Sequence, residues 1–421
     1  MKSELEPTKG NKPAFIVEIV ILIGLIIGVA FLPINTIAQM IVFLGVLALG
    51  AKRLFFNKKY PEYQFQKLTK HSMFFPLISV FFVLLLNVFY DAMQGNNILS
   101  FFMIEMKEGA LYGRIIDILN RGSEAAILAI GMTLVVSSSA GTDISVGSVM
   151  SLAGSLCCML LAGFGVTHVR SADALQMPIL VGVIAGIAIA GVVGLFNGFL
   201  VAKMKIQPMV ATLIFFTAGR AIGLLLTNNK MVYILLDEFK WFGLGRVWVF
   251  PSATVIAAVC IAIMLLILKF TSLGTYVQSV GINSKASRIA GINSVAIILL
   301  CYVICGLFAG VAGIVATSRI YSADSNNIGL NLELDAILAV ALGGNSLGGG
   351  RFNLAGSIIG AYTIQAITTT MYALGVAKAQ APVYKAIIVI LIVVVQSQTV
   401  KAYFAHRKAQ KENSLMVAGR S

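Results

Sequence analysis

The sequence predicts an all-α protein that crosses a membrane many times, and three observations lead to this prediction. Hydrophobic residues make up 58% of the 421 residues and charged residues only 11%, against about 45–50% and about 25% in soluble domains. The apolar residues are gathered in runs of about 20, the length that a helix needs to cross the hydrocarbon core. The net charge of +14 lies in short linkers, which indicates basic cytoplasmic loops rather than a nucleic-acid surface with interleaved aromatic residues.

Twelve runs are predicted to span the membrane. The first two, residues 15–32 and 34–50, form a hairpin, because a continuous helix over both would be about 54 Å long in a core about 30 Å thick. Ten further spans form the core: 73–90, 125–139, 144–166, 178–202, 209–227, 250–268, 294–317, 332–342, 354–374 and 383–395. Small residues in 186–194 and 306–313 are expected to let helices approach closely.

The basic residues support this count. With the N-terminus inside, the inner linkers hold twenty Lys and Arg residues and the outer linkers nine. The positive-inside rule therefore places both termini in the cytoplasm. Removing either of the two weakest spans, 332–342 or 383–395, would put the basic tail outside.

Three regions follow from the spans. Residues 1–72 form an extension with a transmembrane hairpin and a basic cytoplasmic loop, 73–398 the transmembrane core, and 399–421 a basic cytoplasmic tail. No linker exceeds about thirty-five residues, too short for a globular domain of about 50 or more. The Gly-rich run 343–353 lacks the lysine of a phosphate-binding loop, so any step driven by a nucleotide requires another chain.

The stretch 131–154 contains a polar break, SSSAGTD, between apolar segments. Irregular backbone is tolerated in a bilayer only where protein or a water-filled cavity surrounds it. Asp143 either caps the helix expected from Ile144 or faces a translocation route, and both roles can hold together. Arg220 lies about three turns inside its span, and we expect carbonyl or carboxylate partners for it rather than substrate.

All five cysteines fall inside apolar runs, without histidine or acidic neighbours at ligand spacing, so neither a disulfide nor a metal site is predicted. The linker 269–293 contains GINSKASRIAGIN, a short helix with Ala286, Ile289 and Ala290 on one face. Such a helix can dock into a groove on a partner, or it can be an ordinary linker.

Four stretches in this order resemble a known family. They are IDILNRGSEAAILAIGMTLVVSSSAGTDISVGSVMSLAG (116–154), GLFNGFLVAKMKIQPMVATLIFFTAGR (194–220), VGINSKASRIAGIN (280–293) and LELDAILAVALGGNSLGGGRFNLAGSIIGA (332–361). Together they resemble the permease subunit of bacterial ATP-binding-cassette (ABC) importers for simple sugars, of the ribose and galactose type, and most closely the galactofuranose permeases. The resemblance runs from about Met73 to Gln398.

The resemblance implies a transmembrane permease of about ten spans in the bacterial cytoplasmic (inner) membrane. It would form the translocation pathway of an ATP-driven importer for a monosaccharide. The implied partners are a second permease, identical or related, an ABC ATPase that binds the ATP, and an extracytoplasmic sugar-binding protein; the chain itself would hold no cofactor and catalyse no reaction. A helix that rests on the ATPase would include Gly281, Asn283, Lys285, Ala286, Arg288 and Gly291.

Several polar residues are candidates for the sugar pathway: Asp143, Asn197, Gln207, Thr212 and Gln365. For the neutral ones, hydrogen bonding between helices is the favoured alternative. Glu333 and Asn331, expected at the outer end of a short span, are assigned to the side of the binding protein. Two departures from the family pattern stand out: Ser284 and Lys285 replace glutamates common in the coupling segment, and Thr142 replaces an aliphatic residue.

Two other classes remain as alternatives. A secondary transporter coupled to an ion gradient would favour more buried carboxylates than this chain has. An intramembrane enzyme is disfavoured because the three histidines, His71, His168 and His406, lie in linkers, and no span pairs a nucleophile with a base.

Overall fold

The structure is a computed structural model that describes residues 73–396 apart from 96–99, 108 and 378, together with a few positions between 21 and 50. The predicted basic loop 51–72 and the tail 399–421 lie outside the described residues, as does most of the predicted hairpin 15–50. The fold described here is therefore that of the transmembrane core.

Each of the ten spans predicted for the core corresponds to an α-helix. They are α4 (Phe74–Met93), α5 (Arg114–Ser139), α6 (Val146–Ala162), α7 (Ile179–Ala202), α8 (Pro208–Leu226), α10 (Ser252–Phe270), α13 (Ser294–Arg319), α14 (Leu332–Leu342), α15 (Leu354–Ala373) and α16 (Ala381–Gln396). Among the described residues, six helices are long and apolar enough to cross a membrane: α4, α5, α7, α8, α10 and α13. The predicted class, an all-α polytopic membrane protein, is confirmed.

The linkers carry shorter elements. Three are α-helices: α9 (Asp237–Leu244), α11 (Leu273–Ile282) and α12 (Ser284–Ile289). Two are single 3₁₀ turns, η1 (Ser100–Phe102) and η2 (Ala172–Ala174). The strands are β1 (Glu105–Lys107), β2 (Ala110–Tyr112), β3 (His168–Val169), β4 (Val232–Ile234), β5 (Arg246–Val247), β6 (Phe250–Pro251) and β7 (Ser322–Ala323).

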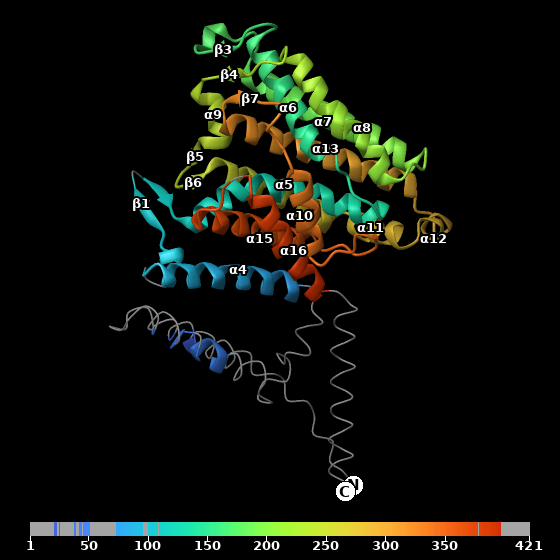
Figure 1. The fold of residues 1–421 in the computed structure, drawn as a ribbon. Helices are drawn as coiled ribbons and strands as arrows, with labels where there is room; N and C mark the ends of the chain where they lie inside the picture. The colour runs from blue at the N-terminus through green and yellow to red at the C-terminus, as the bar shows by residue number, and fades with distance from the viewer. Residues whose placement is uncertain are drawn as a thin grey trace.

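The strands gather at one end of the helical bundle (Figure 1). β4 lies between β3 and β7, parallel to β3 and antiparallel to β7. This small sheet joins the linkers that follow α6, α8 and α13. The hairpins β1–β2 and β5–β6 also meet there, where the Leu111 N–H donates to the Val249 carbonyl at 3.4 Å. We call this end of the molecule the strand end.

The remaining linkers meet at the opposite end, which carries α11 and α12 (Figure 1). The Gly350 N–H donates to the Ser137 carbonyl at 3.1 Å, Gly281 packs against the same carbonyl, and Gly141 packs against Pro208. In the described core the linkers thus alternate between two ends, as the count of spans requires. Which end faces the cytoplasm remains a prediction from the basic residues. We call this second end the coupling end.

Helix α5 is the centre of the core. Ile127, Ile130, Met132 and Leu134 are fully buried, and α5 packs against α10, α13 and α15. Neighbouring α7 and α13 approach closely through glycines: a side chain at Gly194 would meet the Tyr302 carbonyl, and one at Gly306 the Ala190 carbonyl. This confirms the close approach predicted from the small residues of these two helices.

Two helix boundaries differ from the prediction. α5 begins at Arg114, not near residue 125, because its polar first turns find partners: Arg114 Nη1 lies 2.7 Å from Asp91 Oδ1 of α4, and Arg319 Nε of α13 lies 2.9 Å from Glu124 Oε1. Arg114 and Arg319, which were expected in outer linkers, therefore belong to helices. α6 begins at Val146 and ends at Ala162, so it is shorter than predicted.

Candidate functional site

The break between α5 and α6 is built around Asp143. The chain leaves α5 through Ala140, whose positive φ of 54° turns it away from the helix axis. Asp143 is only 2% exposed, and its Oδ1 accepts hydrogen bonds from the Ser145 N–H at 2.9 Å and the Ser145 hydroxyl at 2.6 Å. The carboxylate thus satisfies the N–H of Ser145 in a local turn directly before α6, whereas no side chain caps α6 itself, so the predicted capping role is not observed.

Two further helices join this break. Asn197 of α7 donates from Nδ2 to Ser145 Oγ at 2.9 Å, and the Ile144 N–H donates to Thr212 Oγ1 of α8 at 3.2 Å. We call Asp143, Ser145, Asn197 and Thr212 the junction cluster. All four are buried, so in this conformation they are not open to a passing solute, and their bonds hold α6, α7 and α8 together.

The structure separates the two remaining pathway candidates from the junction cluster. Gln207 is exposed at the coupling end, directly before α8. Gln365 lies in α15 beside Gly122 of α5, and its Nε2 donates to Thr369 Oγ1 at 3.3 Å. Gly122 is 17 residues before the end of α5 at Ser139, about 25 Å along the helix. The five candidates therefore do not form one site within a single chain.

A folded-back segment between α13 and α14 was not predicted from the sequence. Residues 320–331 run back along α6, where Ser151 donates to the Ser325 carbonyl at 3.0 Å and the Ser155 and Ser325 hydroxyls lie 2.6 Å apart. We call 320–331 the return segment. The one signal for it in the sequence is the spacing of serines in α6, every three or four residues on one helix face.

Arg220 holds the return segment in place. Its Nη1 donates to the carbonyls of Ser325 at 2.7 Å, Asn326 at 3.0 Å and Ile328 at 3.0 Å. Two of these carbonyls belong to the buried residues Ser325 and Ile328 of this irregular segment, where an unpaired polar group is costly. The arginine therefore has the carbonyl partners that we expected of a structural residue.

Glu333 differs from the expectation. It is 3% exposed and faces Gly147 in the first turn of α6, because the return segment carries the chain inward before α14 begins. Its Oε2 has no hydrogen-bond partner among the described residues. In this conformation Glu333 does not lie on an exposed surface, and its role at the side of the binding protein stays a prediction. Asn331 is exposed, with a φ of 64° directly before α14.

A second charge inside the core is also paired. Lys385 of α16 donates from Nζ to both carboxylate oxygens of Asp335 in α14, at 3.0 and 2.8 Å. Both side chains are largely buried. A charge at membrane depth requires such a partner, and this pair ties α16 to α14.

The six predicted coupling residues lie together at the coupling end. Asn283 caps α12, its Oδ1 accepting the N–H groups of Lys285 at 3.1 Å and Ala286 at 3.0 Å. Gly281 touches the backbone of Ser137 and Gly350. Lys285, Ala286, Arg288 and Gly291 are exposed.

Two apolar side chains stand out beside these residues. Ile289 is 90% exposed and Ile282 75% exposed, on helices α12 and α11 at the coupling end.

Comparisons with known proteins all point to transporter permeases. Residues 114–396 match the model of the branched-chain amino acid transport system / permease component family. The chain is 42% identical to the galactofuranose transporter permease protein YtfT of Escherichia coli K12, over 71% of this chain and 84% of that protein.

Two relatives of lower sequence identity are also named as sugar import permeases. The fructose import permease protein FruF of Bifidobacterium longum is 35% identical over 72% of this chain and 83% of its own length. The ribose import permease protein RbsC of Escherichia coli K12 is 34% identical over 67% of this chain and 85% of its own length. No solved structure matches the chain.

Proposed function

Because the chain belongs to the branched-chain amino acid transport system / permease component family, we propose that it is the transmembrane permease subunit of an ATP-driven sugar importer. Its relatives are named as permeases for galactofuranose, fructose and ribose. The similarity to the galactofuranose permease carries the proposal, and a monosaccharide is the proposed cargo. The ATP would bind to a separate ATPase, since the longest described linkers are too short for a nucleotide-binding domain.

The coupling end supports an ATPase as the partner. α12 presents an apolar side chain, Ile289, beside the exposed cations Lys285 and Arg288. An exposed helix with one apolar anchor and a basic rim fits a groove with acidic edges on another protein. The proposed orientation therefore puts α12 in the cytoplasm.

A motion of α12 has a direct path into the core. α11 precedes α12, and Gly281 of α11 lies against the last turn of α5 and against Gly350. The last turn of α5 leads at once into the junction cluster, which is bonded to α7 and α8. We propose that the ATPase moves these helices by pushing on α12, a shear of packed elements.

The sugar would pass between two permeases rather than through one. The junction cluster is buried within the chain, whereas Gln207 is exposed and available to line a shared passage. The second permease is an identical copy or a related chain.

Copurification tests the proposed docking of the ATPase. We expect the full chain, expressed with its partner ABC ATPase, to bind that ATPase, and Ile289→Glu to lose most of it. The matched control is Phe164→Glu, which changes another highly exposed apolar residue, 71% exposed, at the strand end. Equal recovery of the ATPase with both variants would contradict docking through α12.

A further inference from the structure

A concave apolar groove lies between α6, α7 and α8. It encloses about 410 Å³. Its walls include Leu152 and Leu156 of α6, Val192 and Phe196 of α7, and Phe215 and Ile222 of α8, and every residue that lines it is apolar. Phe196 and Phe215 meet edge to face across it, with ring centroids 5.5 Å apart.

The lining decides which ligands the groove can take. A sugar would lose its hydrogen bonds to water and gain none, at a cost of several kcal/mol per group. A hydrocarbon chain gains roughly 0.8 kcal/mol for each methylene moved from water into such a site. The groove is therefore unsuited to the transported solute and suited to an acyl chain.

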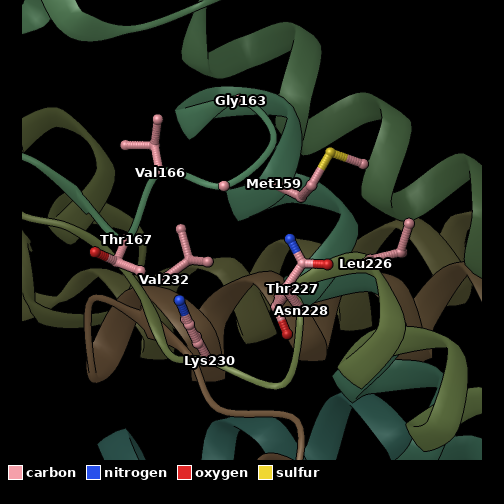
Figure 2. A pocket seen from close by; sticks show the side chains of 10 residues that line it. Met159, Gly163, Val166, Thr167, Leu226, Thr227, Asn228, Lys230 and Val232 are labelled. Atoms are coloured by element: carbon pink, nitrogen blue, oxygen red, sulfur yellow. The ribbon is translucent and has the colours of Figure 1, made fainter.

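One residue links the groove to a polar rim. Leu226, the last residue of α8, lines both the groove and a second, smaller cavity at the strand end. Figure 2 shows this second cavity, with Thr227, Asn228 and Lys230 from the turn after α8 facing Val166 and Thr167. Its volume of about 20 Å³ holds about one water molecule, so a headgroup would rest on the rim and not inside.

The rim has the charge and the depth for a phospholipid headgroup. Lys230 is exposed and forms no ion pair with the described residues, and no acidic residue lines either cavity. α8 has 19 residues, about 28 Å at 1.5 Å each, which matches the hydrocarbon core. The turn that carries Lys230 then lies at the level of the headgroups.

We infer that the groove between α6, α7 and α8 binds one anionic phospholipid, with an acyl chain against Val192, Phe196 and Ile222 and its phosphate near Lys230. The site would stabilise the packing of α7 and α8 near the strand end, away from their short connection at 203–207. This binding goes beyond the transport of sugar and does not depend on it.

Native mass spectrometry of the full chain tests the site. The purified protein is equilibrated with vesicles of equal phosphatidylglycerol and phosphatidylcholine, and the lipid that survives detergent is counted. We expect wild type to keep phosphatidylglycerol. Val192→Trp places a large side chain in the groove and should lose most of this lipid. Ile184→Trp changes an equally exposed residue of α7 that does not line the groove, and should keep it. Equal retention by both variants, or equal loss, would overturn the inference.

A separate experiment tests whether Lys230 contacts the phosphate of the lipid. Lys230→Gln should lower the preference for phosphatidylglycerol over phosphatidylcholine about fivefold, since one basic residue near a membrane surface contributes about 1 kcal/mol. Arg170→Gln, an exposed cation at the same end that lines neither cavity, should leave the preference unchanged. An unchanged preference in Lys230→Gln contradicts the assigned headgroup position.

A measurement on the wild-type chain guards against variants that fail to fold. Phosphatidylglycerol with a photoreactive group in its acyl chain should label peptides of α7 and α8 that line the groove. Labelling spread evenly over the lipid-facing helices would overturn the site. So would an absence of label together with disulfide crosslinks between two copies of the Val192→Cys variant, which would show that a second permease covers the groove.

Discussion

At the residue scale, charged side chains inside the bundle hold its helices and segments together. Arg220 binds three carbonyls of the return segment, Lys385 pairs with Asp335, and Arg319 pairs with Glu124. In each case a residue that is expensive at membrane depth fastens one helix or segment to another. The sequence shows that such residues must have partners, but the partners come from helices distant in the chain.

The first prediction concerns Asp143. Replacing it with alanine leaves the Ser145 N–H and hydroxyl buried without their acceptor, at a cost of about 1–3 kcal/mol. We expect a corresponding loss in the free energy of unfolding, measured by denaturant titration in detergent, with a smaller loss for Asp143→Asn. Asp173→Ala, at an exposed position, is the control. Normal stability and assembly with lost sugar uptake would instead assign Asp143 to the sugar route.

The second prediction concerns Arg220. In Arg220→Lys, an ammonium on a shorter side chain replaces the guanidinium that reaches three carbonyls. The return segment should loosen, so hydrogen exchange at backbone amides of 322–331 should be faster than in wild type. Arg170→Lys, an exposed outer-linker change, should not alter it. Unchanged exchange in Arg220→Lys would show that other contacts hold the segment.

At the element scale, short irregular pieces between the helices connect the coupling end to the core. α12 is exposed, α11 lies against the end of α5, and the α5–α6 break bonds to α7 and α8. A small helix of six residues can therefore act on four larger ones. This arrangement depends on the close contact of Gly281 with the backbone of Ser137 and Gly350.

The third prediction tests that contact. A methyl group at Gly281 would collide with the Ser137 carbonyl and with the Gly350 backbone, neither of which can move as a flexible side chain does. We expect Gly281→Ala to reduce ATPase stimulation and uptake severely. Gly274→Ala lies in the same helix, where a methyl would make ordinary contacts with Leu268 and Phe352, and it should behave as wild type. Comparable activity of both variants would refute the transmission path.

The elements differ in how far the sequence predicts them. The ten core helices follow from apolar runs, because hydrophobicity is a local property of the chain. The early start of α5 at Arg114 and the return segment do not, because both depend on contacts across the fold: Arg114 with Asp91, and Arg220 with the carbonyls of Ser325 to Ile328. For the same reason the burial of Glu333 was missed, and the joining of Asp143, Asn197 and Thr212 into one cluster was not foreseen.

At the scale of the whole molecule, the described linkers are sorted to two ends, and the positive-inside rule predicts that the coupling end faces the cytoplasm. The five native cysteines are all buried. A thiol reagent should therefore react with an introduced, exposed cysteine and not with the native ones, and can test this orientation.

The fourth prediction follows from that assignment. Trp248 is 93% exposed at the strand end, so Trp248→Cys should react with a membrane-impermeant maleimide in intact spheroplasts. Ile289→Cys, at the coupling end, should react only after the membrane is opened. The reverse pattern would invert the proposed topology and place α12 beyond the reach of a cytoplasmic ATPase.

The most direct measurement of the central claim is sugar uptake into proteoliposomes that contain this chain. We predict that labelled monosaccharide enters only when the ATPase, the binding protein and ATP are all present, and that dissipating proton and sodium gradients changes nothing. Uptake by this chain alone, driven by an ion gradient and indifferent to ATP, would contradict the account and show a secondary transporter.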